Sequence, residues 1–288
     1  MVVRVLESAS MERIPIQRLG CYLEADEQGV LLGSAGDAVV REPWASAVEA
    51  LVRRYVAAWG NDLHSVYVRG SVAKGWALEG SSDVDTLAVL RRDASGEAGS
   101  ESVDAWASAV EAEMRHALPF VVGVEVDVVP FEVALDRARI EAFVLKTQAT
   151  CVHGQDLADR LEPYVLGPEV AFQTRFFRQH LESFVRGYAH EPVTDRPGFL
   201  VWMVRRFLRL GMELVMVKEG RYTRDLYLCY ESFAKHYPAW EGEMRQALEL
   251  AVNPVATPES EAFVHSFGAC LAKEADRKLA AWGWRCGS

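Results

Sequence analysis

The sequence has few cysteines, and their positions do not indicate a disulfide framework. They are Cys21, Cys151, Cys229, Cys270 and Cys286, which are widely separated, and no two of them form a C-x-x-C pair. An odd, scattered set argues against a disulfide scaffold and against a thiolate zinc site. We therefore expect reduced thiols, as in a cytoplasmic protein.

Long apolar runs and an excess of basic residues are also missing. No window approaches about 18 uncharged apolar residues, so we expect no membrane span, and the first residues lack the apolar core of a signal peptide. The 31 Lys and Arg residues are outnumbered by 41 Asp and Glu residues, which leaves a formal net charge of -10. Because affinity for nucleic acid depends on many cationic contacts with phosphates, this charge disfavours a nucleic-acid acceptor. It suits a cationic small molecule better.

Several catalytic motifs are absent. The seven histidines show no H-E-x-x-H or other metal-binding spacing, and there is no G-x-S-x-G, so a zinc peptidase and a serine-hydrolase elbow are both disfavoured. Gly70 and Gly75 have the glycine spacing of a Walker A loop, but Trp76 stands where that loop requires lysine. The chain must therefore bind any phosphate in another way.

The first half of the chain alternates helical and strand patterns, and the second half is helical throughout. Strand patterns cover 64–70, 83–90, 120–129 and 149–154, and helical patterns cover 44–59, 103–114 and 132–146. Alternating runs at 21–40 predict a small hairpin. From about 165 onward apolar residues recur at helical spacing, which predicts helices near 172–188, 202–217, 225–237, 241–251 and 259–281.

The most informative stretch is VYVRGSVAKGWALEGSSDVDTLAVL, residues 66–90. A strand leads into Gly70 and Ser71, where glycine permits a close backbone approach and exposed N–H groups can cradle phosphate oxygens. Asp83 and Asp85 then open the next strand. Because side chains alternate along a strand, both carboxylates point to the same face.

Two aspartates on one edge, without basic partners nearby in the sequence, repel each other unless a cation lies between them. Oxygen-only ligation suits Mg²⁺, which also binds substrate phosphates. A third carboxylate would complete a two-metal site for in-line phosphoryl displacement. The next strand offers Glu125 and Asp127, which share a face, so one could bind metal while the other acts as general base.

The segment GSVAKGWALEGSSDVDTLAV resembles the signature of the polymerase-beta-like nucleotidyltransferase superfamily, a G-S turn followed by D-x-D. The resemblance implies a small mixed sheet flanked by helices, two Mg²⁺ ions, and ATP or another nucleoside triphosphate as co-substrate. It places Gly70 and Ser71 at the triphosphate and makes Asp83 and Asp85 metal ligands. The loop residues Lys74 and Ser82 are added as candidates for nucleotide contact.

Two patterns within this superfamily compete for the third acid. VDVVPFEVALDRARIEAF, followed by an apolar strand and HGQDL, is similar to the minimal nucleotidyltransferases and would make Asp127 the ligand. VEVDVV resembles the strand of aminoglycoside adenylyltransferases that carries a catalytic Glu, which would be Glu125. We favour Asp127 as the ligand and Glu125 as the candidate base.

The segment KEGRYTRDLYLCYESFAKHYP resembles the C-terminal helical domain of streptomycin and spectinomycin adenylyltransferases. In that family a helix pair joined by a glycine-containing turn carries a basic residue toward the nucleotide. By position this residue is Arg224, with Arg221 as the alternative.

Together these features predict an α+β fold, in which a nucleotidyltransferase core with a small mixed sheet precedes an all-helical C-terminal domain. The expected divisions are 1–43 as an N-terminal embellishment, 44–162 as the core and 163–288 as the helical substrate-binding domain. The expected reaction is Mg²⁺-dependent transfer of AMP from ATP to a hydroxyl of a small cationic acceptor such as an aminoglycoside. A toxin-like enzyme acting on protein or tRNA, and a non-catalytic nucleotide-binding module, are the alternatives.

Overall fold

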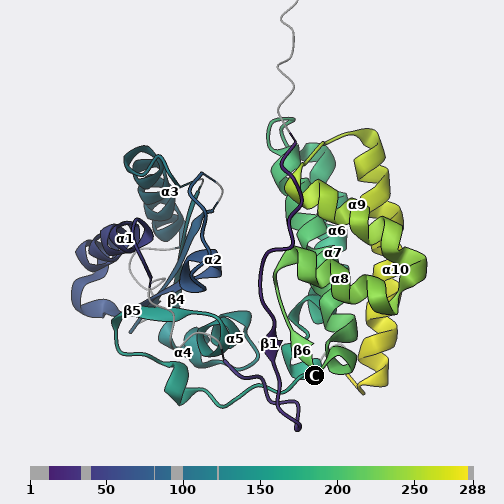
Figure 1. Ribbon diagram of the computed structural model, residues 1–288. Helices are drawn as coiled ribbons and strands as arrows, with labels where there is room; N and C mark the ends of the chain where they lie inside the picture. Colours follow the sequence, from purple (N-terminus) through teal and green to yellow (C-terminus); the bar gives the residue numbers. More distant parts are fainter. Residues whose placement is uncertain (1–12, 34–39, 81, 92–99, 122, 285–288) are drawn as a thin grey trace, which may run out of the picture. The chain divides into compact units, whose positions relative to one another are not determined.

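The computed structural model describes residues 13–33, 40–80, 82–91, 100–121 and 123–284 (Figure 1). The chain divides into two compact units. The sheet unit comprises 22–172 and 216–222, and the helical unit comprises 1–21, 173–215 and 223–288. The domain boundaries expected at 43 and 162 stay predictions. Within the described ranges, no helix is both long and apolar enough to cross a lipid bilayer.

The sheet unit contains a four-stranded mixed sheet in the order β4-β3-β2-β5. The strands are β2 (Leu63–Arg69), β3 (Val84–Leu90), β4 (Val124–Pro130) and β5 (Thr150–Gly154). β2 runs antiparallel to both of its neighbours, and β3 runs parallel to β4. The C-terminal end of β2 therefore meets the N-terminal ends of β3 and β4 at one edge of the sheet.

Two amphipathic helices, α1 (Trp44–Trp59) and α3 (Ser100–Ala117), pack their apolar sides on one face of this sheet. α1 ends at Gly60, whose φ of +48° suits a residue without a Cβ atom. The short α2 (Gly70–Ala73) follows β2 directly. The shared core is formed mainly by aliphatic side chains from both layers, including Val48, Leu51, Val66, Val68, Val84, Ala88, Val110, Met114, Val124 and Val126.

The helix predicted at 132–146 is two helices, α4 (Phe131–Leu135) and α5 (Ile140–Thr147), so the prediction of one helix was wrong. The break lies at Asp136, whose Oδ1 accepts a hydrogen bond from the Ala138 N–H at 2.9 Å. An aspartate side chain that bonds the backbone two residues ahead competes with helical hydrogen bonding. The apolar periodicity of the segment does not reveal this competition.

The hairpin predicted at 21–40 is correct only at its turn. Asp26 Oδ1 accepts hydrogen bonds from the Gln28 and Val30 N–H groups, and an antiparallel bridge joins Ala25 to Leu31. The strand β1 (Leu23–Glu24), however, pairs with the distant β6 (Arg221–Tyr222). The remainder of the predicted hairpin, at 34–39, lies outside the described residues.

The second half of the chain is built from helices, as predicted, except for the two-residue strand β6, which the prediction of an all-helical half did not include. These helices are α6 (Phe172–Gly187), α7 (Arg196–Glu219), α8 (Leu226–His236), α9 (Glu241–Val252) and α10 (Pro258–Ala281). Short 3-10 turns lie at Gly60–Asp62, Ala158–Arg160, Pro168–Val170, Tyr188–His190 and Pro238–Trp240. α10 begins with a reciprocal capping box between Thr257 and Ser260, with Pro258 in the first turn. Aromatic side chains such as Phe177, Phe207 and Phe267 fill the core of the helical unit.

A buried acid joins two of these helices. Glu213 on α7 is fully buried, and its carboxylate accepts hydrogen bonds from the Gln173 N–H, the Thr174 N–H and the Thr174 hydroxyl, at 2.7–3.0 Å. These donors lie in the first turn of α6, where N–H groups have no partner inside the helix. Burial raises the pKa of Glu213 from 4.5 to about 7, although the three hydrogen bonds act in the opposite direction.

Replacing Glu213 with glutamine should change how stability depends on pH. The folded pKa of about 7 lies above the unfolded value near 4.5, so the wild type loses stability as pH rises through this interval, by about 3 kcal/mol in total. The Glu213→Gln variant should lack this pH-dependent loss. The missing acceptor oxygen changes its free energy of unfolding by the same amount at every pH, so it does not affect the slope. Urea unfolding from pH 4.5 to 8 measures both slopes, and parallel curves would contradict the burial of an ionisable group here.

Candidate active site

The turn after β2 requires glycine at its first position. Gly70 has a φ of +72°, and a Cβ atom added there would lie 2.6 Å from Asp85 Oδ2. Both the positive φ and the close approach of the carboxylate therefore disfavour a larger residue. Ser71 follows at the start of the single turn of α2 and is half-buried. The predicted G-S pair thus lies directly beside the second aspartate of D-x-D.

Asp83 and Asp85 lie at the start of β3, as predicted. Asp83 is exposed, whereas Asp85 is half-buried and stands opposite Arg69 of β2 on one side and Glu125 of β4 on the other. Among the residues that the structure describes, Asp85 Oδ1 has no hydrogen-bond partner although it is buried. A buried polar atom without a partner is costly, and a water molecule or a bound cation would satisfy it.

The environment of Asp85 opposes its ionisation. Burial is the largest cause, and the neighbouring charges of Asp83 and Glu125 add to it, so the pKa of Asp85 is raised to about 8. Arg69 acts in the opposite direction but does not outweigh them. At neutral pH and without a cation, Asp85 is therefore mostly protonated, which is typical of a carboxyl group in a functional cleft.

The two acids of β4 contact a basic residue that the sequence analysis missed. Glu125 and Asp127 share one face of the strand, and Arg69 Nη2 donates hydrogen bonds to Glu125 Oε1 at 2.7 Å and to Asp127 Oδ2 at 2.5 Å. The sequence analysis noted no basic residue close to Asp83 and Asp85 along the chain, and Arg69 reaches this edge from the neighbouring strand β2. Arg69 directly precedes the G-S pair, and antiparallel pairing of β2 with β3 would have placed it opposite Asp85.

The predicted magnesium ligands are only partly brought together. No cluster of three His, Cys, Asp or Glu side chains that could hold a metal occurs in the part of the chain that the structure covers. Asp83 and Asp85 fit a hard cation, because they offer carboxylate oxygens at one edge and one of these oxygens is buried without a partner. Asp127 instead contacts Arg69, and its role as third ligand stays a prediction.

A buried hydrogen-bond chain supports the acid strand from the opposite face of the sheet. The Tyr55 hydroxyl of α1 lies 2.9 Å from Thr86 Oγ1 and donates to the Asp127 carbonyl oxygen at 3.3 Å. The Thr86 hydroxyl in turn donates to the Glu125 carbonyl oxygen at 3.1 Å. Tyr55 and Thr86 are fully buried, so these bonds hold the β4 backbone at both acid positions.

The loop between the turn and D-x-D contains the other two predicted contacts. Ser82 closes this loop, because its Oγ accepts a hydrogen bond from the Leu78 N–H and its own N–H donates to the Leu78 carbonyl, both at 2.9 Å. The Lys74 ammonium lies 5.9 Å from the centre of the Trp76 ring. Contacts of Lys74 and Ser82 with a nucleotide stay predictions.

The predicted basic residues of the second half lie in different surroundings. Arg221 donates to Glu219 Oε2 at 2.9 Å, and its guanidinium lies 3.6 Å from the centre of the Tyr22 ring. Arg224 belongs to the helical unit, where burial and the charge of Arg224 lower the pKa of Arg206 to about 10. Two nearby guanidiniums of this kind suit an anion, but the role of Arg224 at a nucleotide stays a prediction.

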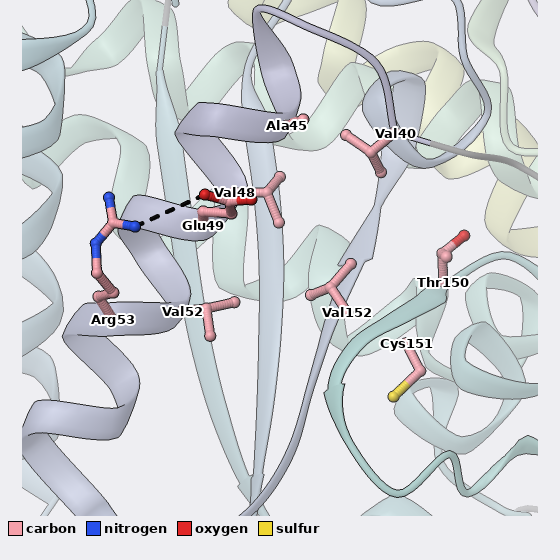
Figure 2. Close-up of a pocket in the computed structure, with 9 residues that line it drawn as sticks. All are labelled: Val40, Ala45, Val48, Glu49, Val52, Arg53, Thr150, Cys151 and Val152. Atoms are coloured by element: carbon pink, nitrogen blue, oxygen red, sulfur yellow. Dashed lines mark ion pairs between the residues drawn. The ribbon is translucent and has the colours of Figure 1, made fainter.

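A pocket of about 470 Å³ lies elsewhere in the sheet unit, between α1 and the edge strand β5 (Figure 2). Four of its nine lining residues are valines, and the Glu49–Arg53 ion pair lies at its side. None of the predicted catalytic acids lines it. The pocket is therefore distinct from the acidic edge formed by β2, β3 and β4.

Replacing Gly70 with alanine should destabilise the protein more than the same change at Gly75. Both glycines have positive φ, +72° and +80°, but a Cβ atom at Gly75 meets nothing within 4 Å. Gly75→Ala should cost about 1 kcal/mol for the backbone alone, and Gly70→Ala about 1–3 kcal/mol more for the contact with Asp85. Urea unfolding of the two variants measures the difference, and equal losses would contradict the close approach.

Comparison with known proteins shows which family part of this chain matches. The family described as "Nucleotidyltransferase domain" matches residues 50–148, which include the G-S turn and all four acids of the edge. The crystal structure of a spectinomycin adenyltransferase from Enterococcus faecialis, determined with ATP and spectinomycin, is similar at a TM-score of 0.49 and 11% identity, over 81% of this chain and 99% of that one. No curated protein matches the chain. Residues 50–148 therefore form a nucleotidyltransferase domain, and the protein is a nucleotidyltransferase.

Proposed function

We propose that the enzyme transfers AMP from ATP to a hydroxyl group of a small cationic acceptor, with Mg²⁺ as cofactor and pyrophosphate as the second product. The observation that carries the proposal is the acidic edge of the sheet. There, Asp85 has a buried oxygen without a partner among the described residues, and the Gly70–Ser71 turn lies beside it. A cation-binding pair of carboxylates next to a phosphate-binding turn is the minimum that nucleotidyl transfer requires.

The residues of this edge take different roles in the proposed reaction. Asp83 and Asp85 would hold Mg²⁺, which when bound neutralises and orients the triphosphate. Gly70 and Ser71 would contact phosphate oxygens through backbone N–H groups and the Ser71 hydroxyl. The absence of a side chain at Gly70 lets the backbone approach closely, as it already approaches Asp85.

Glu125 is the proposed general base. Its side chain is 56% exposed and so can reach a bound acceptor, whereas that of Asp127 is 43% exposed and makes the shorter hydrogen bond to Arg69. Glu125 would take the proton from the acceptor hydroxyl. The acceptor oxygen then forms a bond to the α-phosphorus, the bond from that phosphorus to the bridging oxygen breaks, and pyrophosphate leaves with the electron pair.

Charge supports a cationic acceptor. Even with Asp85 protonated, the carboxylates of Asp83, Glu125 and Asp127 at this edge outnumber the guanidinium of Arg69, and the whole chain has a net charge of -10. Such a surplus attracts an amine-bearing substrate and repels a polyanion. An aminoglycoside combines several amines with the hydroxyl groups that the reaction needs.

Pyrophosphate release from each of the four nucleoside triphosphates, with Mg²⁺ and a panel of aminoglycosides, tests the proposal. We expect ATP to be turned over and one or more aminoglycosides to stimulate release. The Asp83→Asn/Asp85→Asn double variant should lose more than about 100-fold in rate, because even outer-shell partners of a metal contribute about 10–100-fold. Asp159→Asn, at an exposed aspartate of the same unit, should leave the rate unchanged.

Two results would contradict parts of this proposal. If ATP turnover occurred but no cationic small molecule stimulated it, the acceptor assignment would fail and protein or RNA acceptors would take its place. If the double variant retained the wild-type rate, the assignment of Asp83 and Asp85 would fail.

A further inference from the structure

Arg69 lies beside the acidic residues at this edge of the sheet and contacts two of them, Glu125 and Asp127. One nitrogen, Nη2, donates to both Glu125 Oε1 and Asp127 Oδ2, at 2.7 and 2.5 Å. The Arg69 side chain is only 23% exposed, which is less than the side chain of either partner. Water screens the charges of such a partly shielded ion pair less than it screens those of a pair on an open surface.

The strand register makes this contact a fixed feature of the sheet. Arg69 pairs directly with Asp85 across β2 and β3, and Asp85 pairs with Glu125 across β3 and β4. The three residues thus form one cross-strand row that reads basic, acidic, acidic. Asp127 lies two residues beyond Glu125 on the same face and accepts a hydrogen bond from Arg69 Nη2.

The electrostatics of the row agree with this geometry. Burial lowers the pKa of Arg69, but the charges of Glu125, Asp127 and Asp85 together outweigh burial and raise it. Arg69 therefore keeps its positive charge. Because a guanidinium and a divalent cation carry charge of the same sign, they cannot both neutralise Asp127 without repelling each other.

We propose that Arg69 is an internal counter-cation that competes with a divalent metal ion for Asp127. While Arg69 holds Asp127, a metal ion binds to this edge through Asp83 and Asp85 without Asp127. The proposal rests on the proposed function, since it takes Asp83 and Asp85 as ligands. It adds a positioning role for Arg69 that sets how many carboxylates the metal ion can use.

Measuring Mn²⁺ binding in the absence of nucleotide tests this role. The EPR signal of free Mn²⁺ decreases as the ion binds and so reports the affinity. Arg69→Gln should bind Mn²⁺ about tenfold more tightly or better than wild type, because it removes a positive charge and frees Asp127. Asp127→Asn alone should change the affinity less than about twofold, since Arg69 already occupies that acid. In the Arg69→Gln/Asp127→Asn double variant the gain should disappear.

Two controls separate competition from a general effect of charge. Arg54→Gln removes an arginine of the same unit that pairs with Glu113 at the surface, and it should leave Mn²⁺ affinity unchanged. Unfolding followed by circular dichroism confirms that each variant is folded. If Arg69→Gln does not fold, Arg69→Lys replaces it, because lysine lacks the planar fork and should free Asp127 in part. That variant should bind Mn²⁺ several-fold more tightly, again only when Asp127 is present.

The outcomes are distinct. Arg69 variants that bind Mn²⁺ no more tightly than wild type would overturn the proposal. A gain of equal size in the Asp127→Asn background would also overturn it, because the gain would then come from net charge alone. Failure of the proposed function has a different signature, in which Asp83→Asn binds Mn²⁺ as well as wild type does.

Discussion

Repulsion among the carboxylates at one edge of the sheet is the constraint on which the rest of the active site depends. Asp83, Asp85, Glu125 and Asp127 lie near the same edge because β3 and β4 are parallel and start there. Like charges brought to the same edge of a sheet destabilise a fold unless they are paired, protonated or neutralised. The protein uses the first two means, since Arg69 pairs with Glu125 and Asp127, and the raised pKa of Asp85 keeps that acid mostly neutral.

The scaffold holds these groups in place against their repulsion. Tyr55 and Thr86 bind the β4 backbone from the buried face, at the carbonyl oxygens of Glu125 and Asp127. Gly70 lets the turn after β2 come close to Asp85. Acids on the ends of paired strands are held more exactly than acids on loops, because the ladder of backbone hydrogen bonds sets their spacing.

The site nevertheless keeps one unfavourable feature. Asp85 Oδ1 is buried and has no hydrogen-bond partner within the described ranges, and its carboxyl group cannot ionise freely. Elsewhere in the chain a buried acid is fully engaged, since Glu213 accepts three hydrogen bonds at the start of α6. Natural proteins tolerate unsatisfied groups mainly where function uses them, and the contrast between the two acids agrees with a cation-binding role for Asp85.

Much of this protein could be predicted from local sequence patterns. The G-S turn, the D-x-D at the start of β3 and the shared face of Glu125 and Asp127 follow from strand alternation and glycine chemistry. The bounds of α8, α9 and α10 follow from helical periodicity to within about two residues. These features depend on neighbours a few residues apart, so the order of residues suffices to determine them.

Other features were decided only by the tertiary structure. The contact of Arg69 with the acids of β4 spans 56 and 58 positions in the chain, and the β1–β6 pairing joins segments about two hundred positions apart. The break at Asp136 depends on whether a side chain or the helix takes the backbone N–H group. Such partners are selected by strand register and burial, because pairing energies depend on which groups are brought into contact and removed from water.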